Sequence, residues 1–323
     1  MKKIAIVNSS SFAEHFPEQL ERLTTIGEVK RFNFPQDVEQ KVLVENLKDF
    51  DYIIASVTPF FKKEFFEGCD KLKLISRHGI GYNNVDAKSA REHGVHVTIV
   101  EGVVEQDAVA ENAIALLMGI SRRVVESSKA AKEGNWKDRA NFMGYQIRGK
   151  TTGIIGLGNI GSRVGSILKG GFKNEIFAYD PILGDEEIER RGAKPVSLET
   201  LLTESDFISL NAFLTEENYH MLNADAFQKM KDGVLIVNTA RGALVDDKAL
   251  LAAIESGKVA GYGSDVVENE PVGAEYFLFE NERVVISPHT SAYTWECLRG
   301  MGEKVVDDVE KVNAGQLPEV LVN

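Results

Sequence analysis

Three side chains in the second half of the sequence have the types that a carbonyl reduction requires. Arg241, Glu270 and His289 each follow a short, β-branched apolar run. A guanidinium offers a planar, permanently charged fork for a carboxylate, and an imidazole exchanges protons near neutral pH. A carboxylate beside that imidazole would orient the ring and stabilise its charged form. The set suits reduction of a 2-keto acid, with Arg241 holding the substrate and His289 protonating the new alkoxide.

The positions of these residues carry more weight than their types. A lone histidine means little, because the chain has five others: His15, His78, His93, His96 and His220. Open α/β sheets bind ligands at the carboxyl ends of their strands, and all three residues stand at such ends. Glu268, two residues before Glu270, is the alternative partner for His289.

Residues 156–161 read GLGNIG, which is the spacing G-x-G-x-x-G. The pattern is weak alone, but an apolar run precedes it and a run of helical period follows it. Gly156 permits a tight turn, Gly158 lets the backbone approach a pyrophosphate, and Gly161 lets helix and strand pack closely. The amides at the start of the helix, from Asn159 and Ile160, would face the anion.

Asp180 ends the next apolar run, about 20 residues beyond the glycines. Its carboxylate can accept hydrogen bonds from ribose hydroxyls and would repel a 2′-phosphate. The predicted cofactor is therefore NAD rather than NADP. The alternative is a glycine turn beside a capping aspartate.

Short apolar runs alternate with stretches of helical period, a pattern typical of parallel sheets built from βαβ units. A long helix is predicted over residues 104–125, and another after Tyr293. The expected strands are residues 3–7, 51–57, 73–77, 95–100, 152–156, 175–180, 207–212, 234–239, 260–267 and 284–289.

The totals fit a globular protein of two domains. The chain has 323 residues, 43% hydrophobic and 27% charged, with a formal net charge of -12. An acidic surface repels phosphate backbones and anionic lipid, so neither nucleic acid nor membrane is an expected partner. Cys69 and Cys297 make no disulfide framework or metal motif, which favours a reduced cytoplasmic setting. No signal peptide, membrane span or metal site is predicted.

Several blocks together resemble the D-isomer-specific 2-hydroxyacid dehydrogenases, over essentially the whole chain. The matching segments are RHGIGYNNVDAKSAREHGV (77–95), GKTTGIIGLGNIG (149–161), MKDGVLIVNTARGALVDDKAL (230–250), SDVVENEP (264–271) and SPHTSAYT (287–294). The resemblance implies a Rossmann NAD-binding domain, residues 101–293, inserted into a flavodoxin-like substrate-binding domain, residues 1–100 and 294–323. It also implies an active site in the cleft, a D product and a homodimer formed through the nucleotide domain.

The resemblance also implies a role for individual residues. Arg241 would bind the substrate carboxylate and keto oxygen, with His289 as acid/base and Glu270 as its partner. Backbone amides of His78, Gly79 and Ile80 would hold the carboxylate. Further contacts with the cofactor would come from Ala212, Thr239, Ala240, Arg241, Asp265 and His289.

The chain departs from the family at three places. Glu101-Gly102 replaces a usual Pro-Gly pair, and Asn211-Ala212-Phe213 replaces a usual histidine-any-proline. Ala55 stands about where a phosphoglycerate enzyme would carry an arginine, and residues 58–61 read TPFF. This favours an unphosphorylated substrate with a side chain that is apolar and bulky, although the phenylalanines could equally be core.

Other functions on the same fold remain open. A phosphoglycerate-type or glyoxylate-type member is one alternative. A formate dehydrogenase is disfavoured because the family's version has glutamine where Glu270 stands. An NADH-sensing corepressor could keep all three residues, and only turnover with a panel of 2-keto acids would distinguish it.

Overall fold

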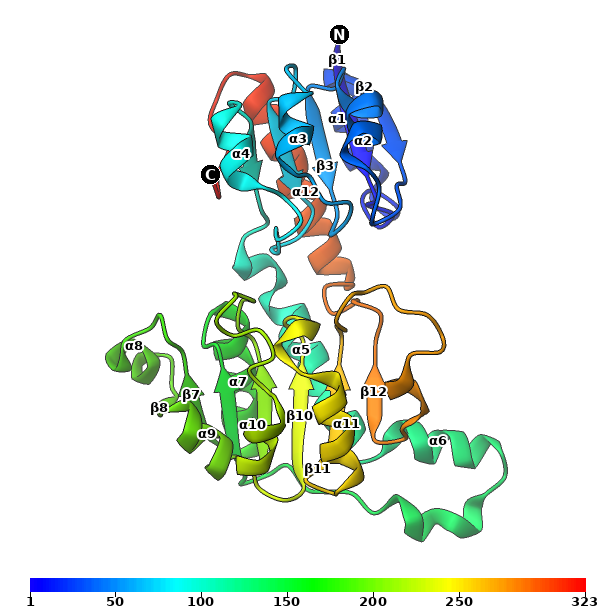
Figure 1. Cartoon of the computed structure of the whole chain (residues 1–323), viewed down its shortest axis with the longest axis vertical. Coiled ribbons are helices and arrows are strands. Elements are labelled where there is room, and N and C mark those ends of the chain that lie inside the picture. Colours follow the sequence, from blue (N-terminus) through cyan, green and yellow to red (C-terminus); the bar gives the residue numbers. More distant parts are fainter. The chain divides into compact units, whose positions relative to one another are not determined.

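The computed structural model describes residues 1–323, which divide into two compact units. The first unit comprises Met1–Glu105 and Tyr293–Asn323, and the second comprises Gln106–Ala292. Each unit has its own sheet, in which every neighbouring pair of strands is parallel, with helices packed on it (Figure 1). The predicted α/β class with two parallel sheets is confirmed. No helix has both the length and the apolar character needed to cross a membrane.

The sheet of the first unit has the order β2-β1-β3-β4-β5. Its strands are β1 (Lys2–Val7), β2 (Gly27–Phe32), β3 (Tyr52–Ala55), β4 (Leu74–Arg77) and β5 (His96–Thr98). Its helices are α1 (Pro17–Ile26), α2 (Gln40–Leu47), α3 (Lys63–Glu67), α4 (Ala87–Glu92) and α12 (Trp295–Asn313). Only β2 was not predicted, because this edge strand reads GEVKRF and lacks an apolar run.

Both faces of this sheet are covered, which explains why its strands read as continuous apolar runs. Successive side chains of β1 point to opposite faces. Ile4 and Ile6 pack with residues of α1 and α12, whereas Ala5 and Val7 pack with residues of α2 and α3. The register of β1 is fixed, because a slip of one residue would exchange its two faces.

The sheet of the second unit has the order β12-β11-β10-β9-β6-β7-β8. Its strands are β6 (Thr151–Ile155), β7 (Glu175–Tyr179), β8 (Lys194–Pro195), β9 (Phe207–Leu210), β10 (Val234–Asn238), β11 (Val259–Ser264) and β12 (Val284–Ile286). Its helices are α6 (Val124–Lys132), α7 (Asn159–Phe172), α8 (Asp185–Arg190), α9 (Leu198–Glu204), α10 (Ala224–Lys229) and α11 (Asp247–Glu255), with three 3₁₀ turns, η1 (Trp136–Phe142), η2 (Gly242–Leu244) and η3 (Phe277–Glu280). The two-residue strand β8 was not predicted.

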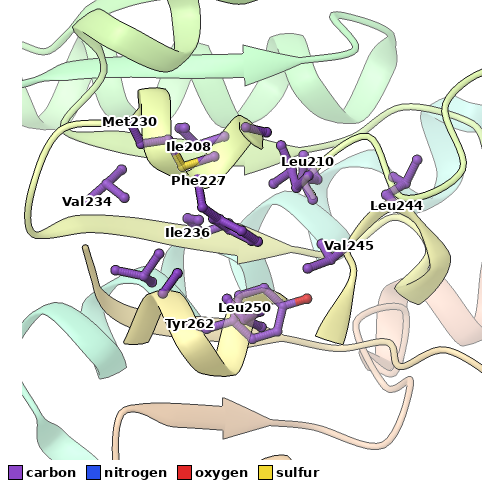
Figure 2. Close-up of a cluster of buried hydrophobic side chains, with 14 of the residues drawn as sticks. Ile208, Leu210, Phe227, Met230, Val234, Ile236, Leu244, Val245, Leu250 and Tyr262 are labelled. Carbon is purple, nitrogen blue, oxygen red and sulfur yellow. The ribbon is translucent and has the colours of Figure 1, made fainter. Parts of the chain in front are cut away.

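Two hydrophobic clusters sandwich this second sheet. One contains Phe227 of α10 and Leu250 of α11 against Ile236 of β10 (Figure 2). The other contains Leu116 and Val164 against strand residues such as Val237. Leu116 belongs to α5 (Gly102–Ser121), which was predicted to run on to residue 125. The helix ends at Ser121, and Arg123 takes a left-handed φ of 52° before α6 begins.

The strand order of the second sheet reverses at β6. From β6, the chain first builds outward through β7 and β8, and then returns to the other side of β6 with β9. Connections that diverge in this way leave a crevice outside the carboxyl ends of the strands, where open α/β sheets bind their ligands. The glycine loop follows β6 directly, so the fold places it at this switch point.

Candidate active site

The carboxyl edge of three neighbouring strands carries the residues selected from the sequence. Arg241 follows β10, Glu270 follows β11 and His289 follows β12, and these strands are adjacent in the sheet. Their loops therefore meet at one edge, because parallel strands place all of their carboxyl ends together.

His289 and Glu270 are in direct contact. His289 Nδ1 lies 2.5 Å from Glu270 Oε1, and both side chains are about one third exposed, at 35% and 31%. With Nδ1 engaged, Nε2 is the ring atom left to exchange a proton with a ligand. His289 also has a φ of 54°, a left-handed conformation that is uncommon for a residue with a Cβ. Strain of this kind persists only where the surroundings determine the turn.

Asp265 fixes the turn that carries His289. Its carboxylate is 1% exposed. It accepts hydrogen bonds from Ser287 Oγ at 2.6 Å, from the amide of Thr290 at 2.8 Å and from the amide of Ser291 at 2.7 Å. The carbonyl of Asp265 also accepts from the amide of His289 at 2.9 Å. The carboxylate is thus engaged within the turn, and its expected contact with the cofactor stays a prediction.

The turn before Arg241 is built around a buried asparagine. Asn238 Nδ2 donates to the carbonyl of Arg241 at 2.9 Å, and Asn238 Oδ1 accepts from the amide of Ala240 at 3.0 Å. Gly242 is required next, because a Cβ there would lie 2.0 Å from the backbone of Val267. Sequence reasoning missed Asn238, although it is fully buried at the end of an apolar strand, where a polar residue needs a partner.

The glycine loop has the geometry that its spacing predicts. Gly156 has a φ of 86°, and a Cβ there would lie 2.7 Å from Ala212. A Cβ on Gly161 would lie 2.0 Å from the carbonyl of Gly156, whereas a Cβ on Gly158 would meet nothing within 4 Å. Gly158 is the N-cap of α7 and gives its first turn no side-chain hydrogen bond. The first amides of α7, including Asn159 and Ile160, are therefore available to an anion.

Several polar groups beside this loop fit a dinucleotide. Asp180 directly follows β7 and accepts from the amide of Leu157 at 2.8 Å and from that of Ile182 at 2.9 Å, so its carboxylate is fixed against the loop. Asn211 Oδ1 and Thr239 Oγ1 are buried and have no hydrogen-bond partner. Buried polar atoms normally have partners, and a bound ribose or amide would supply them. The residues present therefore fit NAD, for which Asp180 would hold ribose hydroxyls.

The first unit also presents a sequence-predicted turn, after β4. The amide of His78 donates to the carbonyl of Ala55 at 2.9 Å and is not available to a substrate. The expectation that this amide binds the carboxylate is therefore wrong. The amides of Gly79 and Ile80 make no backbone hydrogen bond, and Gly79 has a φ of 149°, open mainly to glycine. Only these two amides stay in the prediction.

The side chain of His78 is a structural element of the same edge. It is 6% exposed, and its Nδ1 lies 3.1 Å from Ser9 Oγ. The ring of Phe12 meets it edge-on, with centroids 5.5 Å apart. Burial, with a smaller contribution from the charge of Arg77, lowers the pKa of His78 to about 3. The imidazole is therefore neutral near pH 7, and the turn carries no charge from this residue.

Two segments that depart from the family's usual sequence, residues 211–213 and 58–61, keep regular strand pairing or core packing. The amide of Asn211 donates to Ile155 at 2.8 Å, which extends the β6–β9 ladder, while Phe213 is 69% exposed. In the Thr58–Phe61 segment, Phe61 is 1% exposed and belongs to the core, whereas Phe60 is 39% exposed. Of these two phenylalanines, Phe60 is therefore the one that is exposed.

A nucleotide-binding parallel sheet with a histidine–glutamate pair and an arginine at its edge defines an oxidoreductase acting on hydroxy or keto acids. Residues 114–291 match the model of the NAD binding domain of D-isomer specific 2-hydroxyacid dehydrogenases. The glyoxylate reductase of Thermococcus litoralis is 39% identical over 302 residues, which are 92% of this chain and 90% of that protein.

Solved structures agree with this assignment. A glyoxylate reductase from Paecilomyes thermophila has a TM-score of 0.85 at 33% identity, covering 99% of this chain and 98% of its own. A D-lactate dehydrogenase from Aquifex aeolicus, complexed with NAD and lactic acid, has a TM-score of 0.85 at 27% identity, with the same coverage. The chain belongs to the D-isomer specific 2-hydroxyacid dehydrogenase family, as its sequence motifs indicate. It is an NAD-dependent oxidoreductase.

Proposed function

We propose that this protein interconverts an unphosphorylated 2-keto acid and the D-2-hydroxy acid, using Arg241, His289 and Glu270. The observation that carries the proposal is the 2.5 Å contact between His289 and Glu270. These residues follow β12 and β11, and β11 is the neighbour of β10, the strand that Arg241 follows. A histidine with a fixed carboxylate partner is the arrangement that general acid–base catalysis requires.

Arg241 is proposed to bind the substrate. Its guanidinium stays charged at all relevant pH values and can meet a carboxylate with two parallel hydrogen bonds. The same charge would polarise the adjacent keto carbon–oxygen bond as negative charge develops on the oxygen. The turn that carries Arg241 is set by Asn238, so the guanidinium starts from a defined backbone.

His289 is proposed to move the proton. When bound, NADH supplies the hydride that reduces the keto carbon. The new alkoxide then takes a proton from His289 Nε2, while Nδ1 stays on Glu270. In the oxidative direction the neutral ring accepts the proton of the hydroxyl group, so one residue serves both directions. Glu270 stabilises the charged ring and keeps its orientation.

The two units are proposed to divide the work, with NAD bound by the second unit and substrate selected by the first. In the first unit, the amides of Gly79 and Ile80 would hold the substrate carboxylate, and Phe60 would contact its side chain. Ala55 stands about where a phosphoglycerate enzyme would carry an arginine, so the side chain at this position offers no cation to a phosphate. A small or apolar side chain is therefore favoured over a phosphorylated one.

A homodimer is also proposed, through residues 124–143, the segment that contains α6 and η1. This segment exposes four large apolar side chains, Val124 (52%), Val125 (53%), Trp136 (72%) and Met143 (81%). An exposed apolar patch of this kind marks an interaction surface.

The cytoplasm is the proposed compartment, because Cys69 and Cys297 are free thiols. Both are buried, and burial raises the pKa of each thiol to about 12.

The deciding experiment is steady-state kinetics with NADH and a panel of keto acids. The panel comprises glyoxylate, pyruvate, hydroxypyruvate, 2-ketoisocaproate and phenylpyruvate, with chiral analysis of the products that have a stereocentre. We expect turnover with at least one member, a D product, and a lower rate with NADPH because Asp180 faces the ribose. Tight NADH binding with negligible turnover on every member would instead indicate a binding protein on the same fold.

A further inference from the structure

The loop after β11 carries two carboxylates that contact two different histidines. Glu270 contacts His289, as described above. Glu268, two residues earlier, accepts from the Tyr219 hydroxyl at 2.7 Å, and its other oxygen lies 2.9 Å from His220 Nε2. The rings of Tyr219 and His220 are stacked, with centroids 3.9 Å apart and an interplanar angle of 18°. Glu268 is thus engaged at both oxygens.

The backbone explains how neighbouring carboxylates reach opposite partners. In an extended segment, residues two apart point to the same side. Asn269, between the two glutamates, has a φ of 60° and breaks that regularity. Asparagine is among the residues that tolerate this left-handed conformation. The carboxylates of Glu268 and Glu270 are consequently directed to different histidines.

His220 is tied by its backbone to the turn that follows Arg241. Its amide donates to the carbonyl of Ala243 at 2.8 Å, and the amide of Leu222 donates to that of Leu244 at 3.0 Å. Ala243 and Leu244 belong to η2, the turn directly after Arg241. His220 therefore contacts the Arg241 turn through its backbone and the Glu270 loop through its ring.

These two loops also touch directly. A Cβ on Gly242 would lie 2.2 Å from the amide nitrogen of Glu268, so the backbones are in close contact there. The side-chain contacts of Glu268 and the backbone contact at Gly242 therefore hold the same segment of the loop after β11. A shift of the Glu268 segment would move Glu270, and with it the ring of His289.

From these contacts we propose that Glu268 is a positioning residue. Its contacts with His220 and Tyr219 form a clamp that holds the loop carrying Glu270, and thereby fix where Glu270 and His289 lie relative to Arg241. The proposal rests on the proposed function, since it assumes that Glu270 and His289 carry the proton transfer. It assigns Glu268 no contact with substrate or cofactor. Small displacements of a catalytic group lower the rate steeply, with about 1 Å costing on the order of 100-fold.

The clamp lies in an acidic setting, in which the ring of His220 contacts Glu268. Asp246 and Asp247 act electrostatically on the same groups, and Asp247 contacts the Tyr276 hydroxyl at 2.5 Å. Burial, with further contributions from the charges of Glu268 and Asp246, raises the pKa of Asp247. Removing Glu268 thus relieves repulsion as well as breaking the clamp, so its neutral isostere is needed as a comparison.

The test measures kcat, KM for glyoxylate and the NADH dissociation constant in the full-length protein. We expect Glu268→Ala and His220→Ala to lower kcat by about 10- to 100-fold while the NADH constant stays within about twofold of the parent. Glu268→Gln should recover most of the activity, because an amide keeps the shape and can still accept from Tyr219. Glu255→Ala removes an exposed acidic residue from α11 of the same unit and should leave all three constants unchanged.

A double-mutant cycle with Glu270→Gln tests whether Glu268 affects kcat through Glu270. If Glu268 acts through Glu270, then Glu268→Ala should lower kcat by less than about twofold when Glu270 is already glutamine. Parent-like kcat in Glu268→Ala, or a loss that multiplies in full with that of Glu270→Gln, would overturn the proposal. If Glu270→Gln itself behaves like the parent, the proposed function fails as well. Should Glu268→Ala not fold, as judged by circular dichroism, His220→Ala and His220→Gln answer the same question.

Discussion

At the carboxyl edge of the second sheet, an imidazole and a carboxylate contact each other, whereas at the same edge of the first sheet the Arg77 guanidinium donates to backbone carbonyls and the imidazole of His78 is neutral. His289 and Glu270 are each about one third exposed and form a direct pair. His78 of the first unit is 6% exposed, and its ring nitrogen contacts a serine hydroxyl. The architectures are alike, but the exposed histidine–carboxylate pair lies at the edge of the second sheet.

In both units the parallel sheet fixes where the loops lie, whereas the loop residues determine which side chains stand there. In both units the strands are buried on two faces and bring their loops to one edge. Chemistry then depends on whether a loop residue is exposed and in contact with another ionisable side chain, as His289 is with Glu270. A buried neutral histidine serves instead to fix a turn, as His78 does beside Gly79.

The largest expected effect is at His289. Substitution by alanine removes the proton donor and acceptor, so kcat should fall by about 100-fold or more in both directions. The NADH dissociation constant, measured by fluorescence titration, should change little, since the glycine loop and Asp180 are untouched. A variant with more than about a tenth of the parent kcat would show that His289 does not carry the proton.

Arg241→Lys should have the next largest effect. Lysine keeps the positive charge but loses the planar fork, so kcat/KM for the keto acid should fall by about 10- to 1000-fold, or roughly 1.4 to 4 kcal/mol. The matched control is Arg163→Lys, at an exposed ion pair with Asp107 in the same unit, which should leave kcat/KM near that of the parent. Equal kcat/KM for the Arg241 variant and the parent would place the substrate elsewhere.

The smallest expected effect concerns His78 and stability in acid. Because its folded pKa is lowered to about 3, the unfolded chain binds a proton that the folded chain does not, below about pH 6.5. Stability therefore falls as pH falls from about 6.5 towards 3. His78→Asn keeps a polar contact for Ser9 and removes the titration. Between pH 7 and 5.5 the parent should lose about 1 kcal/mol more unfolding free energy than the variant.

Urea denaturation at the two pH values measures this difference. Equal losses in parent and variant would mean that the imidazole of His78 is not held neutral in the folded protein. The kcat of His78→Asn should stay within about threefold of the parent, since the residue contributes no charge to the proposed proton transfer.

Much of the fold could be predicted from the sequence, because central parallel strands are apolar on both faces and stand out as runs. The strand β2 could not be predicted in this way, since it lies at the edge of its sheet and half of its residues are charged. The end of α5 was also missed, because Arg123 turns in a left-handed conformation that nothing in its residue type announces.

The candidate site was predictable where each residue follows a strand, as Arg241, Glu270 and His289 do. The partners of Glu268 were not predictable, because Tyr219 and His220 lie 49 and 48 residues away in the chain. The engagement of the His78 amide depends on the neighbouring strand β3, so the local sequence could not reveal it. Asn238 had a local signal, a polar residue in a buried strand, that was overlooked.

The central claim is that the charge of Glu270 supports proton donation by His289. It is tested most directly by the pH dependence of reductive kcat/KM in the parent and in Glu270→Gln, which keeps the shape and removes the charge. Reduction needs the protonated ring, and the carboxylate favours that form. The ratio of parent to variant kcat/KM should therefore increase as pH rises from about 5.5 to 8.5. A ratio that stays constant or decreases over this range would contradict the claim.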